Sequence, residues 1–123
     1  MEFLKDDGFR KYLDVEIVEI KDGFASVRGK VRDEFLNFHK TAHGSYIISL
    51  ADIAFAIAAN SDGIKRFALS IKIDFIKPAY KGDELVAEAR VIHKGKRISF
   101  YELSVKKNGD KIARGCAIAY RID

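Results

Sequence analysis

Alternating hydrophobic and polar residues dominate the second half of the chain and predict β-strands there. Four segments alternate with a period of two and are separated by turn-forming residues; they are residues 68–76, 84–93, 97–107 and 111–122. The third segment alternates around Ile98 and Phe100 and then around Leu103 and Val105. Asn108-Gly109, just before the last segment, is a pair that type I′ hairpin turns favour. The short and regular spacing predicts an antiparallel meander.

The N-terminal part predicts a short helix followed by a hairpin. Apolar residues recur every three to four positions within residues 2–13, which is typical of an amphipathic helix. Two strand-like runs follow, at residues 15–20 and 24–31, and Lys21-Asp22-Gly23 lies between them. The Asp-Gly pair supplies the positive φ that a tight hairpin turn requires.

A different pattern occupies the middle of the chain. Residues 32–46 follow neither period and are interpreted as a loop. Residues 47–59 are rich in alanine and nearly apolar on every side, which predicts a buried helix, and Gly63 is a candidate left-handed cap after it. One long helix is available to cover about six strands, so we expect an α+β fold in which the sheet curls around the helix.

Length and composition limit the possible classes. At 123 residues the chain has room for a single domain, residues 1–123. The net charge of +4 comes from interspersed acidic and basic residues, which argues against a nucleic-acid partner. The acidic N-terminus is unlike a signal peptide, and the longest apolar run is too short to span a membrane. We therefore expect a cytoplasmic protein that has no membrane partner.

The sequence contains few residues that could carry thiol chemistry or bind a metal. The single cysteine, Cys116, lies in the apolar stretch 112–120 and is predicted to be buried. One cysteine and three scattered histidines do not predict a structural zinc site. Two of the histidines, His39 and His93, are interpreted as surface or packing residues.

Asp52 is the one charged residue of the predicted helix. It lies between Ala51 and Ile53, where aspartate is a poor helix former and where burial of an unpaired charge costs several kcal/mol. Such a residue either lines a cleft or takes part in catalysis. The simpler structural alternative is that Asp52 marks the one wet stripe of a half-exposed helix.

Gly44 lies near the start of the same helix, where backbone N–H groups lack partners and a partial positive charge accumulates. This arrangement suits the polarisation of a carbonyl oxygen. Asp52 follows eight residues later. That spacing corresponds to about 12 Å along a helix axis, too far for attack on a carbonyl that the same chain holds at Gly44. If both residues act, we expect the active site to lie at a dimer interface.

Three further polar residues are candidates for the site. His43 could serve as an acid, a base or a binding residue, or could only shape the loop. Asn37 could donate from its amide to a carbonyl, or could close a turn. Ser70 is polar within an apolar strand, but no histidine stands at a recognisable spacing from it, so a serine nucleophile is not supported.

The sequence resembles the hotdog-fold acyl-CoA thioesterases over nearly its whole length. The resemblance is carried by Asn37-Phe38-His39-Lys40-Thr41-Ala42-His43-Gly44-Ser45, then Leu50-Ala51-Asp52 and Ala54-Phe55-Ala56, with a closing Asn60. Within the 4-hydroxybenzoyl-CoA thioesterase superfamily, the chain is most similar to the PaaI-like branch of phenylacetic-acid-degradation thioesterases. Residues 75–79, 82–85 and 95–97 also resemble that branch.

This resemblance implies a hydrolase that cleaves an acyl-CoA to a free acid and CoA. Asp52 would be the nucleophile or the general base, and the N–H of Gly44 would polarise the thioester carbonyl with help from Asn37. His43 would shape or bind at the same spot. Ser70, eighteen positions after Asp52, would orient the attacking water.

Substrate and partner expectations follow from the same resemblance. CoA is part of the substrate, and neither a separate cofactor nor a metal is implied. Lys77, Lys96 and Arg97 are candidates for binding the CoA phosphates, with solvated turns as an equal alternative. Ser45, assigned to the substrate site, replaces the usual second glycine and restricts the backbone there. We expect a homodimer through a strand edge, or a homotetramer as a dimer of dimers.

Two other functions remain open at this point. A hotdog dehydratase would need a histidine base and a helix acid; His43 and Asp52 are present, but the Pro-rich loop and helix Glu of that branch are missing. A non-catalytic acyl-CoA sensor on the same fold would have no reason to keep Asp52. Aryl and medium-chain acyl groups would both suit an apolar pocket near Ile48 and Phe55.

Overall fold

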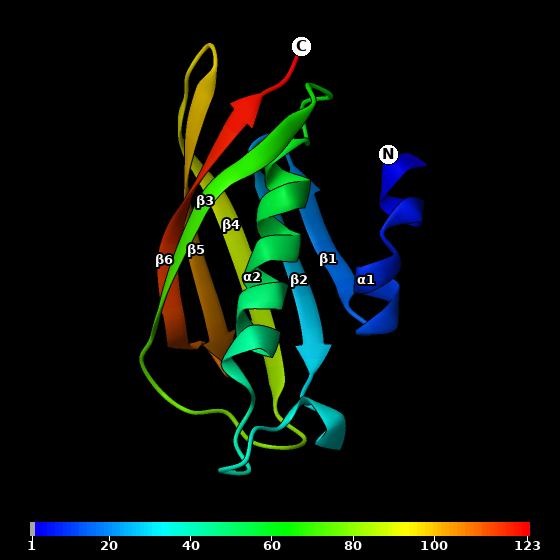
Figure 1. Ribbon diagram of the computed structural model, residues 1–123, viewed down its shortest axis with the longest axis vertical. Helices are drawn as coiled ribbons and strands as arrows, with labels where there is room; N and C mark the ends of the chain where they lie inside the picture. Colours follow the sequence, from blue (N-terminus) through cyan, green and yellow to red (C-terminus); the bar gives the residue numbers. More distant parts are fainter. Residues whose placement is uncertain (1) are drawn as a thin grey trace.

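One long helix, α2 (Gly44–Ala59), lies in the curve of a six-stranded antiparallel sheet in the computed structural model, which describes residues 2–123 (Figure 1). The strands are β1 (Glu16–Lys21), β2 (Phe24–Lys30), β3 (Arg66–Phe75), β4 (Glu84–Lys94), β5 (Ile98–Lys107) and β6 (Asp110–Arg121). The short helical turns are η1 (Glu2–Asp6), α1 (Gly8–Tyr12) and η2 (Asp33–Phe35). The expected sheet curled around one helix is confirmed.

The strand order is β1-β2-β4-β5-β6-β3, and neighbouring strands are antiparallel. The predicted hairpin turns form, with φ of +76° at Gly23 and of +50° and +84° at Asn108 and Gly109. The last four strands are not a simple meander, because β3 pairs with β6 and not with β4. Since β4 pairs with β2, the β1–β2 hairpin extends the sheet and β3 is left at the opposite edge.

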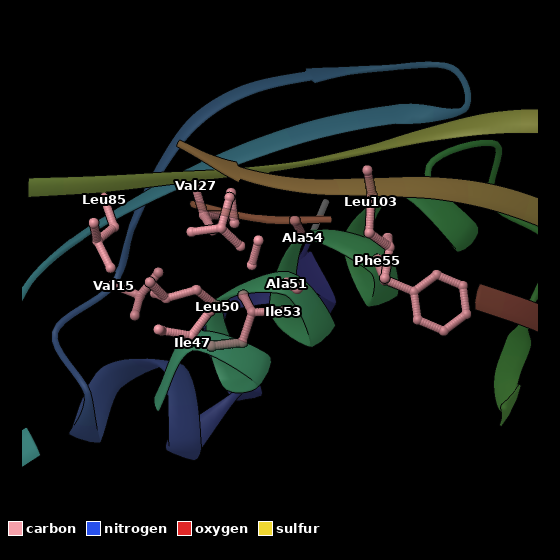
Figure 2. Packing of buried hydrophobic residues seen from close by; sticks show 14 of the residues in the cluster. Val15, Val27, Ile47, Leu50, Ala51, Ile53, Ala54, Phe55, Leu85 and Leu103 are labelled. Atoms are coloured by element: carbon pink, nitrogen blue, oxygen red, sulfur yellow. The ribbon is translucent and has the colours of Figure 1, made fainter. Parts of the chain in front are cut away.

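Small side chains let α2 lie close to the concave face of the sheet. Inward-facing alanines of β2, β4 and β6 are almost completely buried; they are Ala25, Ala87, Ala89, Ala113, Ala117 and Ala119. Leu50 and Phe55 of α2 share one core cluster with these alanines and with Leu103 of β5 (Figure 2). The ring of Phe55 meets that of Tyr101 edge to face, with 5.2 Å between the centroids. The sheet thereby buries one broad face of α2.

The structure corrects two expectations about side-chain direction. In β5, Tyr101 and Leu103 face the core, whereas Phe100 is 41% exposed on the other face. The start of this strand carries apolar residues on both faces, so alternation alone does not identify the inner one. Cys116 of β6 is exposed because it alternates with the buried Ala117.

The predicted N-terminal helix is two separate turns. Asp7 divides them because its carboxylate accepts a hydrogen bond from the N–H of Arg10 at 3.0 Å and so begins α1. Leu4 packs against the core. The segment therefore lies on the same side of the sheet as α2 (Figure 2).

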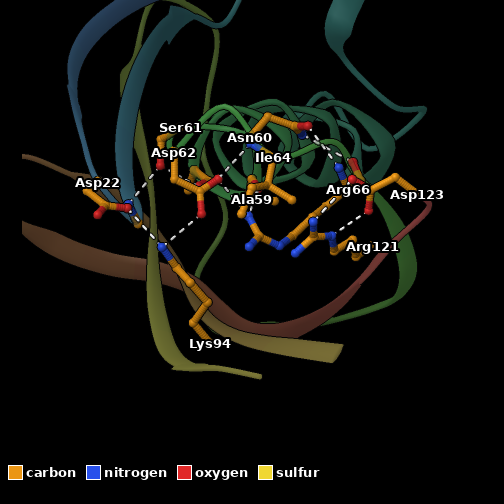
Figure 3. A network of polar contacts seen from close by, with 12 residues as sticks. Asp22, Ala59, Asn60, Ser61, Asp62, Ile64, Arg66, Lys94, Arg121 and Asp123 are labelled. Carbon is orange, nitrogen blue, oxygen red and sulfur yellow. Dashed lines mark hydrogen bonds and ion pairs between the residues drawn. The ribbon is translucent and has the colours of Figure 1, made fainter. Parts of the chain in front are cut away.

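A polar network fastens the C-terminal end of α2 to the sheet (Figure 3). The buried Arg66 donates from Nη1 to the carbonyl of Ala59 and to the carboxylate of Asp62, at 2.8 Å each. Lys94 of β4 donates to Asp62 and also to Asp22 in the β1–β2 turn, at 3.0 Å each. Burial alone would raise the pKa of Asp62, but the hydrogen bonds from Arg66 and Lys94 outweigh it and hold that pKa well below its ordinary value.

Asp62→Ala is expected to lower the free energy of unfolding by about 3 kcal/mol, because it leaves the buried charge of Arg66 unpaired. Asp22→Ala removes the other partner of Lys94, but the Asp22 side chain is 73% exposed. Its loss should therefore stay below about 1 kcal/mol. Urea unfolding of both variants at neutral pH measures the difference.

The loss of unfolding free energy in Asp62→Ala should also depend on pH. The folded state depresses the pKa of Asp62. The Asp62 carboxylate therefore stabilises the fold fully above the ordinary aspartate pKa of about 3.9, and this stabilisation is lost as the pH falls toward the depressed value. Equal losses for the Asp62 and Asp22 variants at neutral pH would contradict the role given to the buried pair.

Candidate active site

His43 caps the N-terminus of α2, which begins at Gly44, three residues earlier than its apolar pattern predicts. The Nδ1 atom of His43 accepts a hydrogen bond from the N–H of Ser45 at 3.1 Å, and the Ser45 hydroxyl lies 2.6 Å from the same atom. Both side chains are exposed. In the single chain, His43 and Ser45 therefore hold the junction between loop and helix.

The backbone N–H of Gly44 is open to a ligand. Within residues 2–123 it donates to no protein atom, whereas the two preceding N–H groups bond to the carbonyls of Ala79 and Phe35. The helix dipole adds partial positive charge at this first turn. The ring of Phe75 stands beside it, since a Cβ on residue 44 would lie 3.3 Å from its Cζ. Gly44 thus offers one donor next to an apolar wall.

Asp52 lies on the face of α2 that the sheet leaves uncovered. Its side chain is exposed, while its neighbours Ala51 and Ile53 are buried. Other fully or partly exposed positions follow at helical spacing and form a stripe; they are Ser45, Ile48, Ser49 and Ala56. The expectation of a helix buried on every side is therefore wrong for this stripe in the single chain.

A cavity of about 560 Å³ opens over this stripe. Apolar residues from η1, α2 and the start of β3 line it beside Asp52; they include Phe3, Leu4, Phe55, Ala56, Phe67 and Ala68. The polar lining residues are Asp7, Asp52, Asn60, Lys65 and Arg66. Apolar walls with a few polar groups are typical of sites for small organic ligands.

The cavity changes the acidity of Asp52. Partial removal from water raises the pKa of its carboxyl group above the ordinary value, and the negative charge of Asp7 raises it further. A raised pKa makes the ionised carboxylate a stronger base. The combination of a cavity and a perturbed acid makes Asp52 the leading candidate for chemistry in this chain.

Asn37 closes the turn that precedes α2. Its Oδ1 accepts hydrogen bonds from the N–H groups of His39 and Thr41 at 2.9 and 3.1 Å, and its Nδ2 donates to the Thr41 hydroxyl at 3.0 Å. The second N–H of its amide bonds to nothing within residues 2–123. In the single chain, Asn37 is thus a turn residue with one donor to spare.

Ser70 does not line the cavity with Asp52. The lining residues of β3 end at Ala68, and a register shift in the pairing with β6 separates Ala68 from Ser70. Ser70 pairs with Ile118 of β6 and is exposed on the edge strand. One chain alone does not bring the two sequence candidates together.

The basic residues assigned to the CoA phosphates lie at opposite ends of the sheet. Lys77 follows β3 at the end where α2 begins, and its Nζ is 4.0 Å from the Asp110 carboxylate (Figure 1). Lys96 and Arg97 lie in the β4–β5 turn at the other end of the strands (Figure 1). All three side chains are exposed. A single chain therefore cannot present them to one ligand.

Sequence reasoning missed Asp7 and Phe75 as neighbours of the site. The only local signal at Asp7 is its cap position before Gly8. Phe75 reads as one more strand residue. Their placement beside Asp52 and Gly44 depends on contacts between distant segments, which no local pattern reports.

No group of three His, Cys, Asp or Glu side chains within residues 2–123 is placed to hold a metal ion. None of the helices in that range is long and apolar enough to cross a membrane.

The known sequences similar to this chain include proteins named as an acyl-CoA thioesterase and as a putative esterase. The family model of the thioesterase superfamily matches residues 39–113. A putative esterase of Archaeoglobus fulgidus is 40% identical over 120 residues, which are 97% of this chain and 78% of that protein. The acyl-coenzyme A thioesterase PaaI of Escherichia coli is 38% identical over 107 residues, 87% of this chain and 76% of that protein.

Solved structures share the fold. The E. coli PaaI structure has a TM-score of 0.96 and 35% identity, and the match covers 99% of this chain and 89% of that one. A Streptococcus mutans protein solved with acetyl CoA has a TM-score of 0.84 and 25% identity, over 88% of both chains. The hotdog fold and the likeness to PaaI that the sequence predicts are confirmed. With most of its length matched by the family model and its fold shared with PaaI, this chain belongs to the thioesterase superfamily.

Proposed function

We propose that this protein hydrolyses acyl-CoA thioesters to a free acid and CoA, with Asp52 acting on a carbonyl that the Gly44 N–H polarises. The observation that carries the proposal is that one helix presents both an unpaired backbone donor and an acid of raised pKa on its uncovered side. The E. coli relative is named an acyl-coenzyme A thioesterase, and the S. mutans neighbour was solved with acetyl CoA, which supports the substrate class.

The site combines Asp52 of one chain with Gly44 of a partner. Within α2 the two residues are about 12 Å apart along the axis, whereas reacting atoms must approach to about 3.5 Å. β3 is a ten-residue edge strand, largely exposed, that carries exposed apolar side chains such as Phe67 and Leu69. Antiparallel pairing of two β3 edges sets the two helices in opposite directions, so that Gly44 of one approaches Asp52 of the other.

The same pairing accounts for the separated basic residues. It brings the Lys77 end of one chain beside the Lys96 and Arg97 end of the other. Three positive charges then flank each composite site, where they suit the phosphates of CoA. A homodimer is accordingly the smallest active unit, and a homotetramer would consist of two such dimers.

The cavity beside Asp52 receives the acyl group, and its apolar lining suits an aryl or medium-chain acyl chain. Water supplies one oxygen to the acid product, the C–S bond breaks, and the CoA thiolate takes up a proton. Asp52 either deprotonates this water or attacks first to form a mixed anhydride, which water then opens. A single turnover in oxygen-18 water tests the anhydride route, because label enters the Asp52 carboxyl group only if an anhydride forms and water opens it at the Asp52 carbon.

Asp52→Asn is expected to lower kcat/KM by at least about a hundredfold, because an amide neither accepts the water proton nor attacks the carbonyl. Thiol release from a panel of aryl and aliphatic acyl-CoAs, measured side by side with the wild type, tests this. Undiminished turnover in the variant would show that the acid is assigned wrongly. Binding of acyl-CoA by the wild type without turnover would point to a sensor.

Gly44→Pro removes the backbone donor while keeping the helix start. Proline fits the first helical position, and His43 before it already has the extended backbone that proline requires, with φ −62° and ψ 139°. Gly44→Ala is the matched control, since it adds the same Cβ beside Phe75 but keeps the N–H. We expect kcat of the proline variant to fall about 100-fold or more below that of the alanine variant. Equal kcat values would rule out this N–H as the carbonyl donor.

Mixing the Asp52→Asn and Gly44→Pro variants tests whether each active site is formed by two chains. A hybrid dimer of Asp52→Asn and Gly44→Pro chains contains one intact site if each site spans the interface, and none if each lies within one chain. Random subunit exchange should restore about a quarter of wild-type activity. Hybrids that are verified by native mass spectrometry and remain inactive would place the site within a single chain.

Asp52→Asn should also stabilise the fold at neutral pH. Because the folded-state pKa of Asp52 is raised, its favourable contribution exists below the ordinary aspartate pKa of about 3.9 and is lost as the pH rises through the folded-state value. Above that value the ionised group disfavours folding, and asparagine removes the cost. The variant should melt above the wild type at pH 7, with a difference that shrinks below about pH 3.9. A lower Tm at pH 7 would contradict this.

A further inference from the structure

The N-terminal segment is tied to the chain just before β1 and lines the cavity beside α2. The Arg10 guanidinium donates to the carbonyl of Val15 at 2.9 Å and to the carbonyl of Leu4 at 3.2 Å, so it ties η1 to the chain just before β1. Leu4 itself packs against the core. Asp7, which lies between these anchors, is thereby placed in the lining of the cavity that also contains Asp52.

Asp7 is the residue that this arrangement presents to the cavity. It lies between η1 and α1, is half-buried, and lines the cavity together with Asp52. Its Oδ1 accepts the N–H of Arg10, which fixes the orientation of the carboxyl group. The neighbouring Asp6 is exposed and does not line the cavity.

The other charged groups that face this cavity lie away from Asp52. Lys65 and Arg66 line its far end, beyond the C-terminus of α2, and the charge of Arg66 is already paired with Asp62 at 2.8 Å. A separate cavity at the start of α2 is lined by Tyr12, Glu34 and His43, among others. Asp7 is the second carboxylate among the described lining residues of the cavity that holds Asp52.

We propose that Asp7 is a positioning residue of the active site, a second carboxylate whose charge across the cavity sets the pH range over which Asp52 is ionised and active. This inference rests on the proposed thioesterase function. Two like charges that share a cavity disfavour each other's ionised form. The raised pKa of Asp52, to which burial contributes most and Asp7 next, agrees with this geometry.

The test compares Asp7→Asn with Asp6→Asn in the full chain. Both substitutions remove one negative charge, and asparagine at position 7 keeps the oxygen that caps α1. The acid limb of kcat/KM against pH, measured with the best acyl-CoA of the panel, should move to lower pH by roughly half a unit or more in Asp7→Asn. It should stay in place in Asp6→Asn. Asp7→Ser, which also caps, should repeat the shift.

Each outcome supports or overturns the inference. An acid limb that does not move in Asp7→Asn, or that moves equally in Asp6→Asn, overturns the role of Asp7 and leaves the thioesterase proposal intact. Absence of thioester turnover in the wild type overturns both proposals. Equal Tm values for the Asp7 and Asp6 variants ensure that an observed shift does not reflect loss of the N-terminal turns.

Discussion

The packing of α2 against the concave face of the sheet is the interaction on which the rest of the structure depends. It is possible because the sheet presents alanines there, so that the helix comes close to the strands. The sheet then covers one broad face of the helix and leaves a stripe uncovered. Asp52 and the cavity beside it lie along that stripe. The catalytic proposal is thus a consequence of how a single helix fills a curled sheet.

Much of the fold could be predicted from local patterns because local physics decides it. The Asp22-Gly23 and Asn108-Gly109 turns require positive φ, and the strands around them alternate clearly. The strand order could not be predicted in the same way. The pairing of β3 with β6 depends on which edge remains free after the β1–β2 hairpin joins β4, and no local pattern records that choice.

In the candidate site, too, local patterns reveal some residues, while others depend on contacts between distant segments. Asp52 could be found because a charge in an apolar helix is costly and needs a reason, and Gly44 because helix starts carry unpaired donors. Asp7 could not be found, since its place in the cavity that contains Asp52 depends on the Arg10 contacts that hold the N-terminal segment. Ser70 and the basic turns show a further limit. Their residue types match the expected chemistry, yet one chain keeps Ser70 apart from Asp52, and Lys77 apart from Lys96 and Arg97.

The exposed thiol of Cys116 has a consequence for how turnover is followed. Reagents that trap the thiol of released CoA also trap a protein thiol, and this chain carries a single cysteine, on the outer face of β6. The resulting signal is limited to one equivalent per chain and does not depend on substrate. It would imitate the initial burst produced when an acyl–Asp52 anhydride accumulates. Cys116 pairs with Lys72 and Glu102, which are also exposed, so Cys116→Ser would remove this background without disturbing the core. The size of the burst would then report only the thiol released from CoA.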